Sequence, residues 1–195
     1  MNHKGTKTLK PERLILRKFV ENDLDSIYKN WSSDDEVTRF LTWSTHKNID
    51  DSKVFLNSCF ERYKTKDNYI WAIELKETGE VIGSISVPSV KESVKEMTLG
   101  YCLGTKWWGR GIMTEAGQAV VKYLFEEIGV ERISAVYAKE NFKSRMVMLQ
   151  LGMKYEGTLR RAALCNSGIV DIVCYALLRC EYEDYVKYNY FGYGN

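Results

Sequence analysis

The hydrophobic positions of the chain follow two different periods, and the change from one period to the other predicts the elements. Segments in which every second residue is apolar are expected to be strands; the first begins at Leu14, and the others cover residues 69–75, 81–87, 96–103, 132–138, 153–161 and 169–178. Segments with apolar residues three or four positions apart are expected to be helices; they cover residues 21–32, 51–64, 114–128 and 142–151. The pattern predicts an α/β fold in which a mixed sheet of about seven strands carries helices on both faces.

Turn residues indicate how neighbouring strands are connected. A Thr-Gly turn at residues 77–80 predicts a hairpin, and an Asn-Ser-Gly turn at residues 166–168 joins the last two strands. Neither an internal repeat nor a low-complexity linker divides the chain. We therefore expect one domain over residues 11–183, a flexible N-terminal tail over residues 1–10, and an aromatic tail over residues 184–195 that serves in packing, forms a partner surface or is disordered.

Composition narrows the possible functions. The 195 residues are 45% hydrophobic, which is enough to bury a complete core. Lys and Arg number 28 against 26 Asp and Glu, so the net charge of +2 gives no support for a nucleic-acid or membrane role driven by bulk charge. The first ten residues lack the apolar centre of a signal peptide, and no segment approaches the roughly 18 apolar residues of a membrane span. These properties predict a cytoplasmic protein.

Cysteine and histidine are too scattered for metal binding or triad chemistry. The five cysteines are odd in number and contain no Cys-x-x-Cys pair, so we expect buried thiols rather than a zinc, redox or disulfide framework. The two histidines, His3 and His46, both lie in polar segments. Neither a metal site nor a histidine-dependent triad is expected.

The strongest chemical signal lies where the strand over residues 96–103 leads, through Gly109 and Gly111, into a helix. The first amides of a helix have no acceptor within the helix and lie at the positive end of its dipole, so they bind phosphate oxygens without many charged side chains. The two glycines let the backbone approach such a ligand closely. Because glycine also serves in ordinary turns, this pattern alone leaves a purely conformational role open.

The run Trp-Trp-Gly-Arg-Gly-Ile-Met-Thr-Glu-Ala at residues 107–116, with the strand before it, resembles the acyl-CoA loop of the GCN5-related N-acetyltransferase (GNAT) family. Its form is similar to that of the ribosomal-protein N-terminal acetyltransferase (RimJ/RimL-like) branch. Three further segments resemble this branch in the expected order; they lie at residues 12–24, 141–153 and 171–178. The resemblance covers nearly the whole chain and implies the GNAT acyl-CoA N-acyltransferase fold, a mostly antiparallel twisted sheet, and acetyl-CoA as the cosubstrate.

The resemblance also implies which residues hold the cofactor. In the family, amides of this loop bind the pyrophosphate, and the end of the central strand pairs with the pantetheine arm like an added strand. The cofactor-binding residues expected on this basis are Tyr101, Cys102, Leu103, Trp108, Gly109, Arg110, Gly111, Ile112, Met113, Thr114, Asn141 and Ser144. The family usually has Gln or Arg at the position of Trp108 and Gly or Ala at the position of Met113. A larger side chain at residue 113 is tolerable if it points into the core, because the phosphate contacts only the backbone amide. Arg110 is either a phosphate contact or a solvated loop residue.

The leaving thiolate needs a hydrogen-bond donor. Many relatives supply a tyrosine from the helix after Asn141, but this chain has Met148 at that position. Asn141 and Ser144 match the Asn-x-x-Ser pattern of the branch, in which the Asn orients the cofactor and the Ser hydroxyl hydrogen-bonds the thiolate. Both residue types also cap helices, and capping is compatible with catalysis.

No carboxylate stands at the two positions where relatives carry an acidic residue, which are Thr98 and Ala163 here. Strand alternation places Glu96 on the same face as Thr98, so Glu96 is expected to act as a base through a water, with an exposed strand-end charge as the alternative. Asp171 either acts as the base, positions backbone or pairs with an arginine. Solvent is a further proton acceptor, because an α-amine with a pKa of about 8 is partly neutral.

The expected function is transfer of an acetyl group from acetyl-CoA to a primary amine by direct attack in a ternary complex. A protein or peptide N-terminus, such as that of a ribosomal protein, is the leading acceptor by resemblance, and a small amine such as an antibiotic or polyamine is the rival. Phe40 and Trp43 are expected on the acceptor side. We expect a monomer or homodimer without nucleic-acid, membrane or metal partners.

Two alternatives belong to other classes of protein. The first is an acyl-CoA-binding module without catalysis, which would explain the missing tyrosine and carboxylates. The second is a dinucleotide or ATP binder built on the same loop. The sequence lacks Gly-x-Gly-x-x-Gly and Gly-Lys-Ser/Thr, which disfavours the second alternative.

Overall fold

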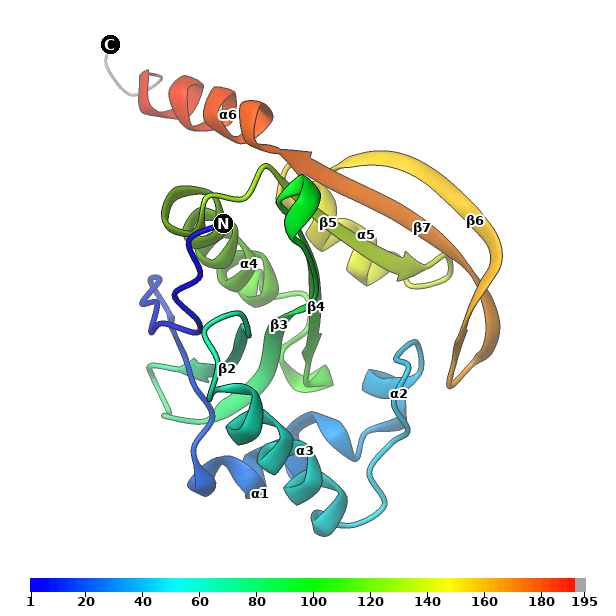
Figure 1. Ribbon diagram of the computed structural model, residues 1–195. Coiled ribbons are helices and arrows are strands. Elements are labelled where there is room, and N and C mark those ends of the chain that lie inside the picture. Colours follow the sequence, from blue (N-terminus) through cyan, green and yellow to red (C-terminus); the bar gives the residue numbers. More distant parts are fainter. Residues whose placement is uncertain (192–195) are drawn as a thin grey trace.

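A seven-stranded sheet forms the centre of the molecule in the computed structural model, which describes residues 1–191 (Figure 1). The strands lie in the order β1-β2-β3-β4-β5-β7-β6, and only β4 and β5 pair in parallel. Their bounds are β1 Leu14–Arg17, β2 Ile70–Leu75, β3 Val81–Lys91, β4 Glu96–Leu103, β5 Arg132–Ala138, β6 Lys154–Cys165 and β7 Gly168–Leu178. The predicted α/β fold with a mostly antiparallel sheet is confirmed.

The helices cover both faces of this sheet (Figure 1). They are α1 Leu24–Ile27, α2 Asp35–Thr38, α3 Ile49–Arg62, α4 Ile112–Tyr123, α5 Phe142–Gln150 and α6 Arg179–Phe191. The single helix predicted over residues 21–32 is broken into a 3-10 turn, α1 and a π-helical turn. The sequence pattern missed α2, which is one turn long, and α6, which follows β7 directly. Of the predicted aromatic tail, residues 192–195 lie outside the described part of the chain.

Two buried clusters, one on each face of the sheet, hold the helices in place. Trp71 and Ile73 of β2 belong to the cluster beneath α4 and α5, whereas Ile70 and Ala72 belong to the cluster beneath α1 and α3. Successive residues of a strand point to opposite faces, so a central strand covered on both sides is apolar throughout. This explains why β2 is buried over four consecutive positions.

Residues 1–10, for which the sequence predicts a flexible tail, lie along the sheet and the end of α4 in this structure. The indole nitrogen of Trp71 donates to the carbonyl of Lys7 at 2.7 Å, and the hydroxyl of Tyr123 donates to the carbonyl of Gly5 at 2.8 Å. Leu9 forms a backbone bridge with Leu16. The two aromatic side chains are buried, and their donors need acceptors, which the N-terminal segment supplies.

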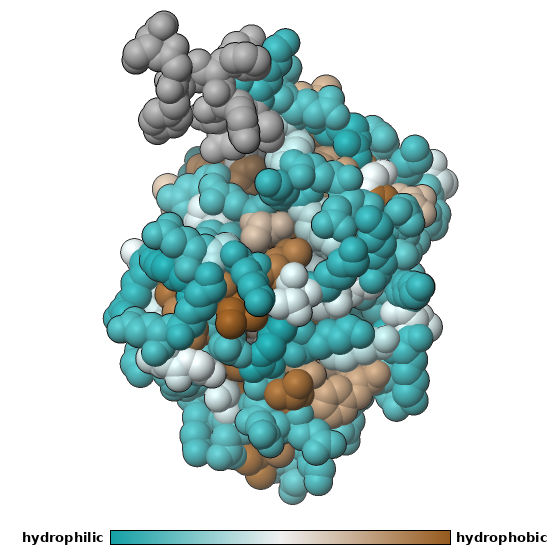
Figure 2. All heavy atoms as spheres, turned by 90° about the vertical axis from the view of Figure 1, so that its left-hand side faces the viewer, coloured by the Kyte–Doolittle hydropathy of each residue, from teal (hydrophilic) through white to brown (hydrophobic). Residues whose placement is uncertain are grey.

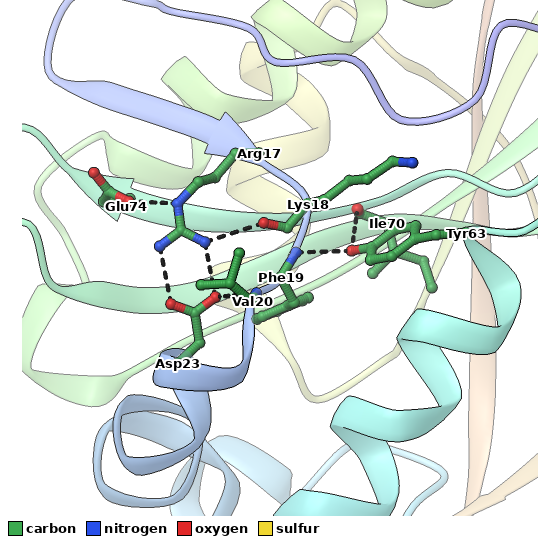
Figure 3. Close-up of polar contacts among 8 residues, drawn as sticks. All are labelled: Arg17, Lys18, Phe19, Val20, Asp23, Tyr63, Ile70 and Glu74. Atoms are coloured by element: carbon green, nitrogen blue, oxygen red, sulfur yellow. Dashed lines mark hydrogen bonds and ion pairs between the residues drawn. The ribbon is translucent and has the colours of Figure 1, made fainter.

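A polar network fixes the segment between β1 and α1 (Figure 3). The guanidinium of Arg17 donates to both carboxylate oxygens of Asp23, at 2.7 and 2.9 Å, and to Glu74 on β2 at 2.5 Å. These two carboxylates raise the pKa of Arg17 further above its usual range. The hydroxyl of Tyr63 accepts from the amide of Phe19 at 3.0 Å and donates to the carbonyl of Ile70 at 2.9 Å. The chain after β1 is thereby tied to α3 and β2.

β4 and β5 pair only at their first residues. The parallel pairing joins residues 96–99 with residues 132–135, while β5 continues alongside β7 to Ala138. Residues 100–103 of β4 therefore have a ladder partner in β3 but none in β5. This divergence leaves an open edge on β4 in the middle of the sheet, next to α5.

The surface facing the left side of Figure 1 is mainly hydrophilic, with small separate apolar areas (Figure 2). Within residues 1–191, none of the helices combines the length and the apolar character needed to span a bilayer.

Candidate active site

A cleft of about 620 Å³ lies at the open edge of β4. Its walls come from the end of β4, the loop after it, the first turns of α4 and α5, and the segment around α2. Segments far apart in the sequence therefore meet around one space large enough for a cofactor.

The loop between β4 and α4 depends on two glycines in the left-handed region. Gly109 has a φ of 71° and Gly111 a φ of 72°. A Cβ at Gly109 would meet no atom within 4 Å, and one at Gly111 would meet only the side chain of Arg13, at 3.6 Å. Backbone conformation rather than crowding thus requires glycine at both positions.

The amides of this loop point to no acceptor within the described residues. None of residues 1–191 accepts a hydrogen bond from the backbone N–H groups of residues 109–114, and no side chain caps the N-terminus of α4. The amide of Glu115 is the first to be paired, and it donates to the carbonyl of Gly111 at 3.0 Å. Six unpaired amides at the positive end of a 12-residue helix form an anion site of the kind that binds phosphates.

Arg13, just before β1, holds this loop from outside. Its Nε donates to the carboxylate of Glu115 at 2.6 Å, and another guanidinium nitrogen donates to the carbonyl of Arg110 at 3.0 Å. The backbone amide of Arg13 also donates to Glu115, at 2.7 Å. Arg13 was not predicted as a site residue, because nothing in the local sequence pattern connects residues about 100 positions apart.

The residues expected to bind the cofactor line the cleft together. They are Tyr101, Cys102, Leu103, Trp108, Gly109, Arg110, Gly111, Ile112, Met113, Thr114, Asn141 and Ser144. The indole nitrogen of Trp108 donates to the carbonyl of Leu103 at 2.7 Å, and the ammonium of Lys143 lies 3.5 Å from the centre of the indole ring. Met113 is 6% exposed, so its side chain points mainly into the core, as its place in the loop requires.

Asn141 and Ser144 lie at the start of α5, facing the end of β4. The Asn141 side-chain oxygen accepts from the Ser144 amide at 3.3 Å, so Asn141 caps the helix. The Ser144 hydroxyl lies 2.9 Å from the hydroxyl of Tyr101. Met148, at the position where relatives carry a tyrosine, is 1% exposed and belongs to the core. Capping uses the Asn141 oxygen and leaves the Ser144 hydroxyl available in the cleft.

Glu96 lies at the other end of β4, outside the cleft. Its carboxylate accepts from the hydroxyl of Ser134 at 2.7 Å and pairs with Arg132 at 3.4 Å and Lys91 at 3.5 Å. Ser134 also lies 3.0 Å from the hydroxyl of Thr98. The sequence grouped Glu96 with Ser144 as a catalytic residue, but Glu96 is the first residue of β4, whereas Ser144 contacts Tyr101 near the end of this strand. The parallel register places Arg132 beside Glu96 and explains their ion pair.

Asp171, the other candidate base, positions backbone. Its carboxylate accepts from the amide of Arg161 at 2.9 Å and lies 3.7 Å from the ammonium of Lys139. Arg161 has a φ of 49° within the irregular pairing of β6 with β7. The hydrogen bond to Asp171 supports this unfavourable backbone conformation.

Next to the cleft, the segment around α2 contacts the hairpin of β6 and β7, which reaches towards α2 in Figure 1. The side-chain amide of Asn166 donates to the carbonyls of Thr38 and Trp43, at 2.9 and 2.8 Å. Phe40 lines the cleft and packs against the buried cluster of Ala138, Cys165 and Val170. Trp43 does not line it, and its ring lies 5.2 Å from that of His46. Of the two expected acceptor-side residues, the structure places only Phe40 in the cleft.

The thiol in the cleft is poorly suited to covalent catalysis. Burial raises the pKa of Cys102 above its usual value, so the thiol stays protonated at neutral pH. Burial also raises the pKa of Tyr101, to about 12. Among residues 1–191, no three His, Cys, Asp or Glu side chains lie close enough to share a metal ion.

Comparisons with known proteins agree with this geometry. A family model described as an acetyltransferase (GNAT) domain matches residues 13–154. The uncharacterized N-acetyltransferase p20 of Bacillus licheniformis is 30% identical over 175 residues, which is 90% of this chain and 98% of the relative. The [ribosomal protein uS5]-alanine N-acetyltransferase of Escherichia coli is 33% identical over 99 residues, which is 50% of this chain and 51% of that enzyme.

A solved structure extends the agreement to three dimensions. The crystal structure of a GNAT-family acetyltransferase from Bacillus anthracis superimposes with a TM-score of 0.78 at 26% identity, covering 89% of this chain and 99% of the other. The matched domain contains the whole loop with its six unpaired amides and the start of α5. The chain therefore belongs to the GNAT family and is an acetyl-CoA-dependent N-acetyltransferase.

Proposed function

We propose that this enzyme acetylates the α-amine of a protein or peptide N-terminus by direct attack on acetyl-CoA in a ternary complex. The observation that carries the proposal is the meeting, in one cleft, of six unpaired amides, the open edge of β4 and the Ser144 hydroxyl. Similarity to an enzyme that acetylates a ribosomal protein supports a protein acceptor.

Two parts of the cleft bind two parts of the cofactor. The amides of residues 109–114 bind the pyrophosphate, where the dipole of α4 adds to their attraction. Residues 100–103, which have no partner in β5, hydrogen-bond the pantetheine arm as an added strand would. The thioester then arrives near the start of α5, within reach of Ser144.

The reaction needs little from ionisable side chains. The neutral amine attacks the thioester carbonyl, a C–N bond forms, and the C–S bond breaks with its electron pair going to sulfur. The Ser144 hydroxyl donates a hydrogen bond to the thiolate. Water takes the proton from nitrogen and later returns one to sulfur. An α-amine with a pKa of about 8 is partly neutral at pH 7, which suits a cleft that Glu96 does not reach.

The acceptor is proposed to enter the cleft on the side lined by Phe40, next to the place where the segment around α2 contacts the hairpin of β6 and β7. Phe40 offers an apolar contact there, and Asn166 holds the two segments together.

Substrate scanning with labelled acetyl-CoA tests this proposal. Purified enzyme is offered peptides with free N-termini, the same peptides blocked at the N-terminus, and small amines that include an aminoglycoside and a polyamine. We expect label on the free peptides and none on their blocked counterparts. Label on the small amines with inert peptides would replace the protein acceptor by a small molecule, and label on nothing would favour a non-catalytic binding module.

A further inference from the structure

Tyr101 brings a second hydroxyl to Ser144 from a different element. Tyr101 lies on β4 and Ser144 on α5, yet their hydroxyl oxygens are 2.9 Å apart. The Tyr101 hydroxyl also lies 3.1 Å from the backbone carbonyl oxygen of Ser144. Both residues line the cleft, whereas Met148 is buried in the core. A tyrosine hydroxyl from β4 therefore lies beside Ser144, although α5 carries Met148 and not a tyrosine at the position used by many relatives.

The hydroxyls of Tyr101 and Ser144 can be hydrogen-bonded in two alternative arrangements, because each hydroxyl has only one proton to donate. The Tyr101 hydroxyl has one proton and two acceptors within reach, the carbonyl and the hydroxyl oxygen of Ser144. If Tyr101 donates to the carbonyl, the Ser144 hydroxyl can donate back to Tyr101. If Tyr101 instead donates to the Ser144 hydroxyl, the Ser144 proton is released to point into the cleft. In this second arrangement Ser144 is both oriented and polarised as a donor.

We propose that Tyr101 is a positioning residue for Ser144, holding its oxygen so that its proton is aimed at the leaving sulfur of CoA. The assignment rests on the proposed function of the cleft. When the C–S bond breaks, the electron pair goes to sulfur and both hydroxyls keep their protons. Burial raises the pKa of Tyr101 to about 12, above the value of about 8.5 for a free thiol, so the pair stabilises the thiolate and does not protonate it. The proton that completes the thiol comes from water.

A double-mutant cycle tests whether Tyr101 acts through Ser144. The variants are Tyr101→Phe, Ser144→Ala and their combination, with turnover measured by release of CoA thiol. We expect Tyr101→Phe to lower kcat about tenfold, which corresponds to losing the hydrogen bond that the oriented Ser144 hydroxyl donates to the charged thiolate, with the dissociation constant of acetyl-CoA within about twofold of wild type. In the Ser144→Ala background, Tyr101→Phe should cost nothing further. Losses that multiply would show that Tyr101 does not work through Ser144.

Tyr155→Phe is the matched control. This tyrosine lies on β6 outside the cleft, and its hydroxyl is 3.0 Å from that of Thr158. Its removal also deletes one hydroxyl contact, so kcat should stay at the wild-type value. A loss equal to that of Tyr101→Phe would mean that the effect is structural.

Titration of bound CoA gives a second readout that does not depend on turnover. Stabilising the thiolate lowers the pKa of the bound thiol, so the ultraviolet absorbance of the thiolate should rise at lower pH in wild type than in Tyr101→Phe, by about half to one pH unit. The complex with desulfo-CoA corrects for the protein's own cysteines. Equal titration of the two proteins would overturn the role of Tyr101. If no N-terminal amine is acetylated, the proposed acceptor fails while this titration still decides the role of Tyr101, and a wild type that binds no CoA would overturn both.

Discussion

The two ends of the cleft are built in different ways. The cofactor end comes mostly from one continuous segment, the end of β4 with the loop and first turn of α4, and it presents backbone amides to the ligand. The acceptor end comes from the segment around α2 and the turn between β6 and β7, which are more than 120 residues apart and are joined by two hydrogen bonds of the Asn166 side chain and by two backbone hydrogen bonds. The cofactor end therefore depends on the backbone conformation of one segment, whereas the acceptor end depends on contacts between distant segments, including those of one side chain.

This difference explains which site residues the sequence could predict. At the cofactor end, Gly109 and Gly111 are visible in the sequence because the loop conformation itself requires them. At the acceptor end, the sequence pattern identifies Asn166 only as a turn residue, although its side chain hydrogen-bonds the segment around α2. A local pattern reports local backbone requirements, whereas a contact across more than 120 residues leaves no periodic signal.

The same reasoning applies to the fold and the catalytic residues. Strand alternation predicted β2 and β5 closely, but not the divergence of β4 from β5 that opens the cleft, because pairing depends on the neighbouring strands. Alternation placed Glu96 on a face of β4, but the position of Arg132 beside it decided its partner. Tyr101 was expected as a backbone contact, and its side-chain contact with Ser144 came from the packing of α5.

The largest expected effect comes from breaking the cofactor end at Gly111. A valine at a φ of 72° is strained and would turn the loop amides away from the pyrophosphate, so Gly111→Val should weaken acetyl-CoA binding on the order of 10- to 100-fold in calorimetry. Gly129→Val is the control, because Gly129 has a φ of 80° and a Cβ there would meet no atom within 4 Å, but this glycine lies after α4. Similar losses of affinity in both variants would mean that general strain, not the loop, controls binding.

Ser144→Ala should show the next largest effect, on turnover rather than affinity. Without the hydroxyl the thiolate loses a donor, and we expect kcat to fall about tenfold while the acetyl-CoA dissociation constant changes less than about twofold. The capping hydrogen bond uses the Ser144 amide, which alanine retains, so α5 stays intact. Unchanged kcat in steady-state kinetics would remove Ser144 from the mechanism.

Asn166→Ala removes side-chain contacts at the acceptor end and leaves the residues of the cofactor end unchanged. Losing two hydrogen bonds should lower the free energy of unfolding by about 1–3 kcal/mol and raise KM for the acceptor several-fold, with acetyl-CoA affinity unchanged. Ser167→Ala is the control, because Ser167 contacts the carbonyl of Arg39 through its backbone amide, which the substitution keeps. A change in acetyl-CoA affinity as large as the change in acceptor KM would contradict the separation of the two ends.

Glu96→Gln should have the smallest effect on activity. The carboxylate lies outside the cleft and pairs with Arg132 and Lys91, so its neutralisation should leave kcat and its pH profile within about twofold of wild type. Stability should fall by about 1 kcal/mol, because these partly exposed ion pairs are weak. If kcat falls tenfold or more and loses its rise with pH, Glu96 acts as the general base despite its position.

The most direct measurement is a crystal structure of the enzyme with CoA. We predict that oxygens of the pyrophosphate lie within hydrogen-bond distance of backbone amides among residues 109–114, with the pantetheine arm along residues 100–103 and the sulfur near Ser144. A diphosphate bound elsewhere, with these amides left facing solvent, would contradict the account.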